Sequence, residues 1–388
     1  MGLGTTAKYD YVLVGGGLQN GLIALALRGQ RPDARIALLE RGAALGGNHL
    51  WSFHAGDVPD DARAFVDPLV EHRWSRYHVR FPRLERDFAE PYSSIPSHRL
   101  DRVVRERLGD APGCAVRLGA EVVEVAPGEV TLAGGERLSG ELVVDARGPE
   151  SLGAGGATGY QKFVGLEVRV APEVCPREPT LMDATVPQSD GLRFMYVLPL
   201  AADRVLVEDT RFSDTPALNV DALRDEVLGY MRARGLGPLE VLRQETGVLP
   251  LPWRLDVAPP APGLLVAGYQ GGWFHPTTGY SLPVAVRLAR TVARHPPSAL
   301  FASDDFRALT TTHEDQLRFC LLLSRLMFTA FPPGERWNVM ERFHRLPVDT
   351  IRRFYAMTLT RADRLRIICG RPPQGMSLRR VLASTEVR

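Results

Sequence analysis

The feature that most constrains the fold lies at the start of the chain, where a strand, a glycine-rich turn, a helix and a second strand follow one another. Residues 8–14 (KYDYVLV) lead into GGGLQNG, an Ala/Leu-rich segment follows, and RIALLE ends at Glu40. This order predicts a βαβ unit whose glycines let a pyrophosphate approach the N-terminal end of the helix. We expect Gly15 and Gly17 to shape that turn and Glu40 to accept hydrogen bonds from an adenosine ribose.

The turn departs from the usual GxGxxG pattern, because the third glycine would fall at Asn20 and the glycine present is Gly21. The alternative to a dinucleotide site is a strand-to-helix turn with a purely structural role. Two later segments favour dinucleotide binding. GELVVDARGP (140–149) predicts a buried strand ending at Asp145, and residues 263–289 predict a strand, a glycine-rich loop and a helix. Three distant segments that converge on one nucleotide fold are typical of FAD enzymes.

In such enzymes the last strand commonly ends in Gly-Asp, and the Asp binds the ribityl chain, whereas Tyr269 follows Gly268 here. This departure leaves the ribityl contacts open and argues against an ordinary flavin hydroxylase. The residues that we expect to bind the cofactor are Gly15, Gly17, Gly21, Glu40, Asn48, Asp145, Gly268, Gly271, Thr278 and Gly279.

Length and composition limit the class of protein. A chain of 388 residues suits two packed lobes, and 45% hydrophobic with 24% charged residues excludes a disordered, collagen-like or coiled-coil protein. A net charge of +2 argues against nucleic-acid binding. The cysteines are scattered singly, so we expect no disulfide framework, no metal site and a reducing compartment.

The periodicity between the nucleotide segments is that of antiparallel strands. Residues 180–186, 192–200 and 204–210 predict a three-stranded meander, the usual wall of a substrate domain. We therefore expect an α/β protein with a Rossmann-like FAD-binding domain, an antiparallel-sheet substrate domain and a helical C-terminal region. The proposed boundaries are 1–50, 95–155 and 260–295 for the first, 51–94 and 156–259 for the second, and 296–388 for the third, with breaks at Pro332-Pro333 and Pro372-Pro373.

The C-terminal region is basic, since residues 316–388 hold 14 Arg against 5 Asp and Glu, a net charge of +9. Its most apolar stretch, residues 317–331, is shorter than the ~20 residues of a membrane-spanning helix and contains two arginines. A solvated helix face is one interpretation. The other is a surface that binds anionic lipid headgroups. Because the N-terminus resembles no export signal, we expect a cytoplasmic protein at the inner face of the cell membrane.

Several strings together resemble one family, the bacterial lycopene β-cyclases. FHPTTGYSLP and LVEDTRFSD are the specific ones, and the resemblance runs nearly end to end. The other matching strings are VGGGLQNGLIALAL, GGNHLWSFH, MDATV, VLPL, RFHRLP, RFYAMTLTRADRLRI and GRPP.

The resemblance implies that the carotenoid lycopene is closed at each end into a β-ionone ring, giving β-carotene through γ-carotene. A proton adds to carbon 2, the cation at carbon 1 is attacked by the carbon 5 to carbon 6 double bond, and a proton leaves carbon 6. The family requires reduced FAD, which NADPH or NADH reduces, although the reaction has no net redox change. A reduced flavin can stabilise nearby positive charge.

The acid of the family's EDT motif falls on Glu208. Strand alternation places Glu208 on one face with Leu206 and turns Asp209 to the other. An apolar pocket would raise the carboxyl's pKa, as a general acid that protonates carbon requires. The alternative is a surface carboxylate paired with Arg204 or Arg211.

His275, beside the cofactor loop, is the second catalytic candidate, as a proton relay. A hydrogen-bonded structural histidine is the alternative, as it is for His49. Aromatic side chains can stabilise a carbocation and line a tunnel for a polyene, although core packing competes with that interpretation. Those that we expect to contact substrate are Trp51, Phe53, Tyr196, Trp273 and Phe274.

Two other functions stay open at this point. One is a redox flavoprotein acting on isoprenoids, whose product, unlike that of a cyclase, would differ in mass from its substrate. The other is a lipid carrier that keeps the fold without flavin, which a yellow purified protein would exclude.

Overall fold

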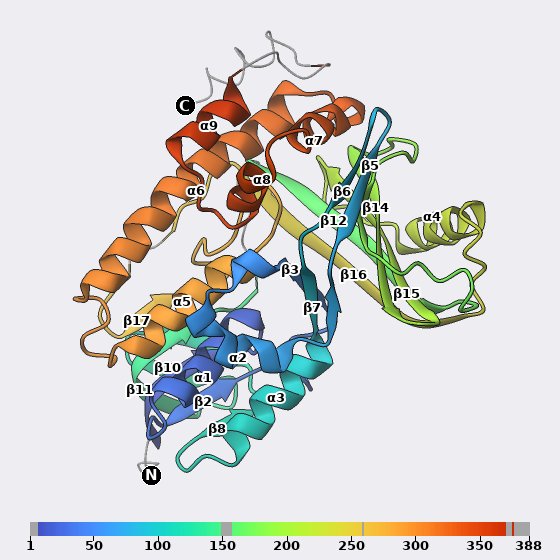
Figure 1. The fold of residues 1–388 in the computed structure, drawn as a ribbon. Helices are drawn as coiled ribbons and strands as arrows, with labels where there is room; N and C mark the ends of the chain where they lie inside the picture. Colours follow the sequence, from blue (N-terminus) through green and yellow to red (C-terminus); the bar gives the residue numbers. More distant parts are fainter. Residues whose placement is uncertain (1–6, 149–156, 258–259, 370–374, 376–388) are drawn as a thin grey trace.

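The computed structural model describes residues 7–148, 157–257, 260–369 and 375, which form three β-sheets and the helices packed on them (Figure 1). This arrangement confirms the predicted α/β class with a Rossmann-like part, an antiparallel sheet and a helical C-terminal region. Three features of the sequence involve residues outside the described ranges. They are the predicted strand segment 140–149, the GRPP string and the Pro372-Pro373 break.

The first sheet contains the predicted βαβ unit. Strand β1 (Ala7–Val14) pairs in parallel with β2 (Ile36–Leu39) and β11 (Arg137–Asp145). The sheet is completed by β8 (Ala115–Arg117), β9 (Val122–Ala126), β10 (Glu129–Leu132) and β17 (Leu264–Val266). Its apolar core is shared with α1 (Leu18–Gln30), α3 (Ser97–Gly109) and α5 (Leu282–Arg294).

The second sheet has the strand order β16-β12-β15-β14-β13-β5-β6. The bounds are β5 (Tyr77–Phe81), β6 (Leu84–Phe88), β12 (Thr158–Arg169), β13 (Thr180–Asp183), β14 (Leu192–Ala201), β15 (Arg204–Ser213) and β16 (Glu240–Pro252). Strands β13 to β15 form the predicted antiparallel meander, although its first strand ends three residues earlier than expected. The order puts β12 between β15 and β16, which are far from β12 in sequence.

A third, small sheet was not predicted. It consists of β3 (Leu50–His54), β7 (Tyr92–Pro96) and β4 (His72–Trp74), all antiparallel. Short helices connect β3 to β4: η1 (Ala55–Asp57), η2 (Asp60–Ala62), α2 (Arg63–Val66) and η3 (Asp67–Leu69). The domain boundaries remain a proposal. This sheet crosses two of them, because β3 begins at Leu50 and β7 ends at Pro96.

The C-terminal region is helical within the described residues, as predicted. It contains α6 (Asp304–Ala330), η4 (Pro333–Glu335), α7 (Trp337–Phe343), α8 (Val348–Tyr355) and α9 (Arg361–Ile368). The Ser303 hydroxyl accepts a hydrogen bond from the Phe306 N–H and caps α6, and the chain leaves this helix just before Pro332.

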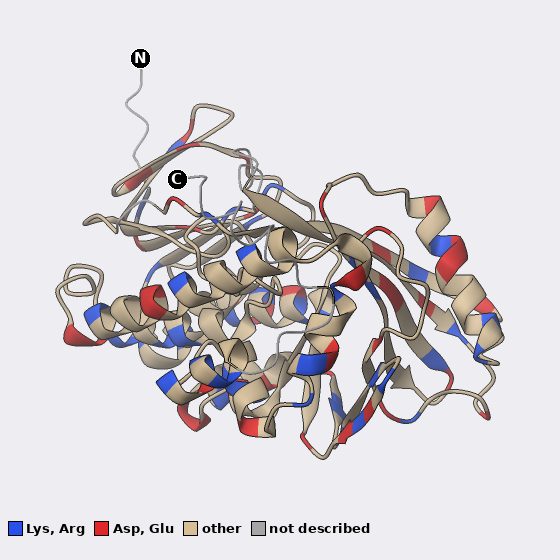
Figure 2. Cartoon of the chain, turned by 90° about the horizontal axis from the view of Figure 1, so that it is seen from above, with Lys and Arg blue, Asp and Glu red and all other residues tan. Residues whose placement is uncertain are grey.

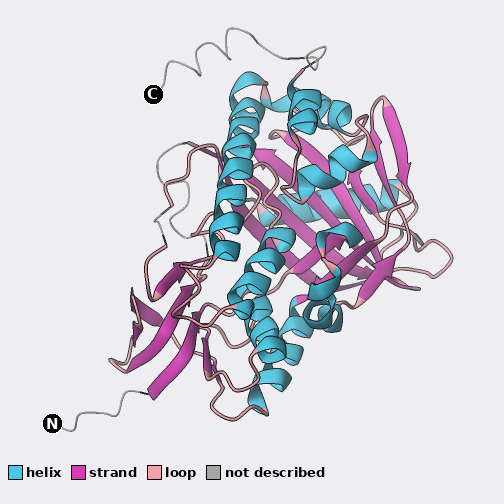
Figure 3. Ribbon diagram, turned by 60° about the vertical axis from the view of Figure 1, so that its left-hand side comes forward, coloured by secondary structure: helices cyan, strands magenta, loops and turns pink. Residues whose placement is uncertain are grey.

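These helices share an apolar core with one face of the second sheet, and α4 (Val220–Ala233), which was not predicted, packs on the other face (Figure 3). Both faces of the sheet are therefore covered. Among the helices of the described residues, none combines the length and the apolar character that crossing a membrane requires.

Candidate active site

The glycine-rich turn after β1 leaves an open space at the start of α1. Gly15 has a φ of +93°, and a Cβ atom on it would lie 2.9 Å from the Ala146 carbonyl oxygen, so the turn requires glycine. A Cβ atom built on Gly17 would meet no atom within 4 Å. Gly17 also gives α1 no side-chain cap, so the first amide groups of α1 are free to bind an anionic group placed there.

The irregular third position of the motif has a structural explanation. Asn20 donates hydrogen bonds from Nδ2 to the carbonyl oxygens of Val14 and Gly15, both at 2.9 Å, and so fixes the end of β1. Gly21 lies away from the cavity, and a Cβ atom on it would lie 2.8 Å from Leu100 Cδ1. Gly21 therefore allows the close packing of α1 against α3, and its cofactor contact stays a prediction.

Glu40 lies beside the turn. Its carboxylate accepts hydrogen bonds from the backbone N–H groups of Gly16 and Gly42, both at 2.7 Å. These hydrogen bonds order the turn. The two oxygens keep lone pairs that can accept a hydrogen bond from a further donor.

The other predicted cofactor residues divide into two groups. Gly268, Thr278 and Gly279 line the cavity described below. The remaining three, Asn48, Asp145 and Gly271, do not. Asn48 donates to the Gln244 carbonyl oxygen, Asp145 pairs with Arg147 at 2.7 Å, and a Cβ atom on Gly271 would lie 2.2 Å from the Val266 oxygen. These contacts fix the surrounding loops, and the cofactor role of the three residues stays a prediction.

Tyr269 occupies the position of the expected aspartate. It donates a hydrogen bond from its hydroxyl to the Gly279 carbonyl oxygen at 2.5 Å, and its ring stacks on Phe274 at 4.1 Å. Tyr269 therefore braces the loop that contains Thr278 and Gly279.

One cavity of about 450 Å³ connects the turn to the second sheet. Gly17, Arg147 and Gly268 line it at the nucleotide end, while Glu208 and Tyr355 line it at the other. Along the sheet its wall follows the strand alternation, with Gln161 and Phe163 of β12, Phe194 and Tyr196 of β14, and Glu208 and Thr210 of β15. Its volume is in the range of small-molecule and cofactor sites.

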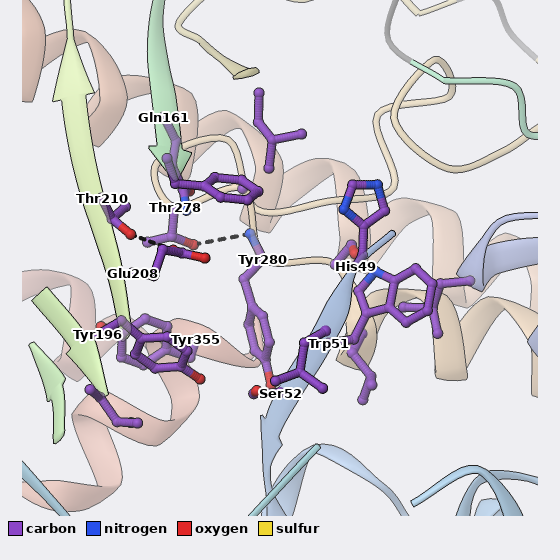
Figure 4. A pocket seen from close by; sticks show the side chains of 18 of the residues that line it. His49, Trp51, Ser52, Gln161, Tyr196, Glu208, Thr210, Thr278, Tyr280 and Tyr355 are labelled. Atoms are coloured by element: carbon purple, nitrogen blue, oxygen red, sulfur yellow. Dashed lines mark hydrogen bonds between the residues drawn. The ribbon is translucent and has the colours of Figure 1, made fainter. Parts of the chain in front are cut away.

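Glu208 projects into this cavity, as Figure 4 shows, and is only 9% exposed. The Thr210 hydroxyl donates a hydrogen bond to its carboxyl group. Burial raises the pKa of Glu208, and the neighbouring Glu245 carboxyl raises it further. The surface ion-pair interpretation is therefore wrong for this residue.

Asp209 points to the opposite face, as the alternation predicts. It is fully buried and forms ion pairs with Arg193 at 2.8 Å and with Arg211 at 2.9 Å. The two adjacent acids thus have different surroundings, one in an aromatic cavity and one in an ion-pair cluster.

The predicted aromatic residues also fall into two groups, those that line the cavity and those that do not. Trp51, Tyr196 and Trp273 line the cavity. Phe53 and Phe274 are not among its lining residues: Phe53 belongs to the core beside α1 and α5, and Phe274 stacks on Tyr269. Both are nearly inaccessible, at 3% and 0% exposure.

His275 is fully buried and does not line the cavity. Its Nδ1 accepts a hydrogen bond from the Thr277 N–H at 3.2 Å, its Nε2 faces the Cys320 sulfur at 3.6 Å, and its ring packs on Phe354. Burial lowers its pKa to about 3. This placement favours the structural alternative for His275 over the proton relay, whereas His49 does line the cavity.

The sequence reasoning missed several cavity residues. Tyr92, Tyr280 and Tyr355 add aromatic rings, and Tyr92 exchanges a hydrogen bond of 3.0 Å with Tyr196. Gln161 has a buried Oε1 without a hydrogen-bond partner among the described residues, an atom poised for a bound group. Glu245 is a second acid. Tyr280 and Tyr355 stood inside two of the resembling strings, so a signal for them was present.

A second cavity of about 210 Å³ lies among helices α6 to α9. It is almost wholly apolar, and Met340 lines both cavities. Ile368, at its rim, is half exposed.

The family model and two similar curated proteins identify the same family. The family model for lycopene cyclase protein matches residues 10–381. A lycopene beta-cyclase from Pseudescherichia vulneris is 42% identical over 94% of both chains, and one from Pantoea ananas is 39% identical over 94% of this chain and 95% of its own.

Solved structures share the fold at low identity. A geranylgeranyl bacteriochlorophyll reductase-like protein from Thermoplasma acidophilum superposes with a TM-score of 0.63 at 14% identity, covering 98% of this chain and 96% of its own. A probable FAD-dependent monooxygenase from Pseudomonas aeruginosa gives a TM-score of 0.59 at 15% identity, covering 85% of this chain and 97% of its own.

Proposed function

Since the chain belongs to the lycopene cyclase family, we propose that it is an FAD-dependent lycopene β-cyclase that converts lycopene through γ-carotene to β-carotene. The observation that carries this proposal is the continuous cavity that begins at the dinucleotide turn and ends at the buried acid Glu208. A cofactor and a reacting double bond can then meet in one space.

The residues at the nucleotide end fit FAD. The open space at Gly17 and the uncapped start of α1 suit a pyrophosphate, and Glu40 suits a ribose. Thr278, Gly279 and the Gln161 Oε1 atom would border the flavin ring. When bound and reduced by NADPH or NADH, the flavin supplies electron density that stabilises positive charge nearby.

The proposed chemistry uses the neutral carboxyl of Glu208 as a general acid. It donates a proton to carbon 2 of the terminal double bond, and the carbon 5 to carbon 6 double bond attacks the cation at carbon 1. Loss of a proton from carbon 6 completes the ring, so the reaction is an isomerisation. Trp51, Tyr196 and Trp273 would face the cation with their aromatic rings.

We place the protein at the inner face of the cell membrane as a peripheral protein, because its substrate is a hydrocarbon. Exposed apolar side chains lie on α6 and α9 near the second cavity, at Leu322, Leu365 and Ile368. That cavity, which shares Met340 with the larger one, is the proposed route for the polyene.

The arginines of the C-terminal region contribute less free charge than their number indicates. Arg353 pairs with Asp363 at 2.6 Å, Arg364 pairs with Asp315, and Figure 2 shows basic and acidic residues interspersed along the helices. We therefore propose a membrane contact in which apolar insertion and a limited number of arginines act together.

Expression in bacteria that accumulate lycopene tests the function. The expected result is conversion of red cells to orange ones that contain β-carotene, identified by chromatography and by a mass equal to that of lycopene. A product with altered mass would instead favour a redox flavoprotein, and a colourless purified protein would favour the carrier.

A further inference from the structure

We propose that Glu245 is the second carboxyl of the proton-donor site and that it positions the proton on Glu208 and sets how strongly Glu208 holds it. This inference goes beyond the proposed function and rests on it, since Glu208 is the proposed donor. The two residues lie on different strands, β15 and β16, which are not neighbours in the sheet.

Strand register brings the two acids opposite a single residue. Gly165 of β12 pairs with Glu208 on one side and with Glu245 on the other. Strands that flank a common neighbour lie about 9–10 Å apart, so the two side chains must lean over β12 to meet.

The absence of a side chain on Gly165 makes this meeting possible. A Cβ atom built there would lie 2.9 Å from Glu245 Cγ, 3.2 Å from Glu245 Oε1 and 3.4 Å from Glu208 Oε2. The first distance is shorter than ordinary Cβ contacts. The glycine thus leaves the space in which the two carboxyl groups approach each other.

The surroundings of Glu245 assign the single proton of the pair to Glu208. Glu245 is 4% exposed, lines the cavity and accepts a hydrogen bond from Arg243 Nη1 at 2.7 Å. Arg243 is itself held by Asn48 Oδ1 at 2.7 Å and Glu167 Oε2 at 3.2 Å. Among the described residues no cation forms an ion pair with Glu208, and two buried carboxylates in contact cannot both remain charged.

The charged and titratable groups around the pair come from every element packed against it. They are Arg243 of β16, Glu167 of β12, Tyr196 of β14, Asp209 of β15 and His49 of the loop before β3. Among them, Arg243 alone is a fixed cation in contact with Glu245, so it balances the negative charge of the pair.

The pair also accounts for both proton transfers of the reaction. When the O–H bond of Glu208 breaks and a C–H bond forms at carbon 2, Glu208 becomes a carboxylate beside the charged Glu245. That repulsion makes Glu208 a stronger base. When the carbon 6 C–H bond breaks, its proton returns to Glu208, and the pair is restored without any other acid or base.

The pH profile of cyclisation with the flavin reduced tests this inference. Activity needs protonated Glu208, so it is present below the pKa of Glu208 and lost as the pH rises through it. Glu245→Gln removes the neighbouring negative charge and should move this alkaline limb at least one pH unit toward acid. Arg243→Gln removes the balancing cation and should move the limb toward alkaline pH. Glu240→Gln, on the same strand but exposed, is the matched control and should leave the profile unchanged.

A spectroscopic readout separates this inference from the proposed function. Infrared difference spectra of the holoenzyme, titrated in pH, report the protonated carboxyl of Glu208 whether or not lycopene is cyclised; Glu208→Gln identifies its band. Its titration should shift toward acid in Glu245→Gln and, by crowding the pair apart, in Gly165→Ala. If the Glu208 band titrates at the same pH in both folded variants as in the wild type, the proposed interaction between Glu208 and Glu245 is wrong. Failure of the wild type to form rings would overturn the function alone.

Discussion

Substituting the two adjacent acids of β15 should separate catalysis from stability. Glu208→Gln keeps the volume of the side chain and can still accept the hydrogen bond from Thr210, so the free energy of unfolding should change by less than ~1 kcal/mol. Ring formation should fall by at least ~100-fold, the usual loss for a general acid, which corresponds to about 2.7 kcal/mol of barrier.

Asp209→Asn should have the opposite pattern. Arg193 is 2% exposed and would keep only the half-exposed Glu226, at 3.0 Å, as a strong ion-pair partner near it. Breaking a buried ion pair costs ~3–5 kcal/mol, and the remaining Glu226 contact places the expected loss near the lower figure. Folded Asp209→Asn should nevertheless cyclise lycopene at close to the wild-type rate, because Asp209 faces away from the cavity.

The assays are chromatography of the carotenoids per bound flavin, and denaturant unfolding of each holoenzyme. In deuterated water the wild type should place deuterium at carbon 2 of each new ring. Near wild-type cyclisation by flavin-loaded Glu208→Gln would refute the reasoning about the donor. A stable but inactive Asp209→Asn would refute the assignment of the two faces.

Three further predictions concern the cofactor and the membrane. Glu40→Ala should weaken FAD binding, measured by flavin retention on dialysis, because both the ribose contact and the order of the turn at Gly16 would be lost. Anaerobic enzyme given one equivalent of dithionite should cyclise many lycopene molecules, measured as product per flavin, because no electrons are consumed. The protein should co-sediment with anionic vesicles more than with neutral ones, at ~1 kcal/mol for each participating arginine, and high salt should release it only partly because apolar residues also insert.

Each of these predictions has a contradicting result. Equal flavin retention by Glu40→Ala and by the wild type would contradict the placement of the adenosine beside Glu40. Consumption of one NADPH per ring would favour the redox flavoprotein. Vesicle binding should fall in Leu365→Ser. The control is Leu239→Ser, at a leucine just before β16 that is exposed to a similar extent, and equal effects of the two substitutions would contradict a membrane contact of α9.

Local chemistry determined the parts of this protein that the sequence alone predicted. The glycine turn at Gly15 and the end of α6 before Pro332 depend on backbone restrictions that a few neighbouring residues set. The opposite directions of Glu208 and Asp209 follow from strand alternation, which is also local.

Tertiary structure decided what lies beside these local features. Sequence patterns cannot tell which buried ring meets the core and which meets the cavity. By alternation Trp51 and Phe53 share one face of β3, yet only Trp51 lines the cavity, and Trp273 and Phe274 lie in a loop to which alternation does not apply. His275 lies in the same loop and is buried outside the cavity lining. Glu245 became a neighbour of Glu208 only because β12 pairs with both β15 and β16 and carries Gly165 between them. Such pairing depends on strand order, which short-range sequence patterns do not encode.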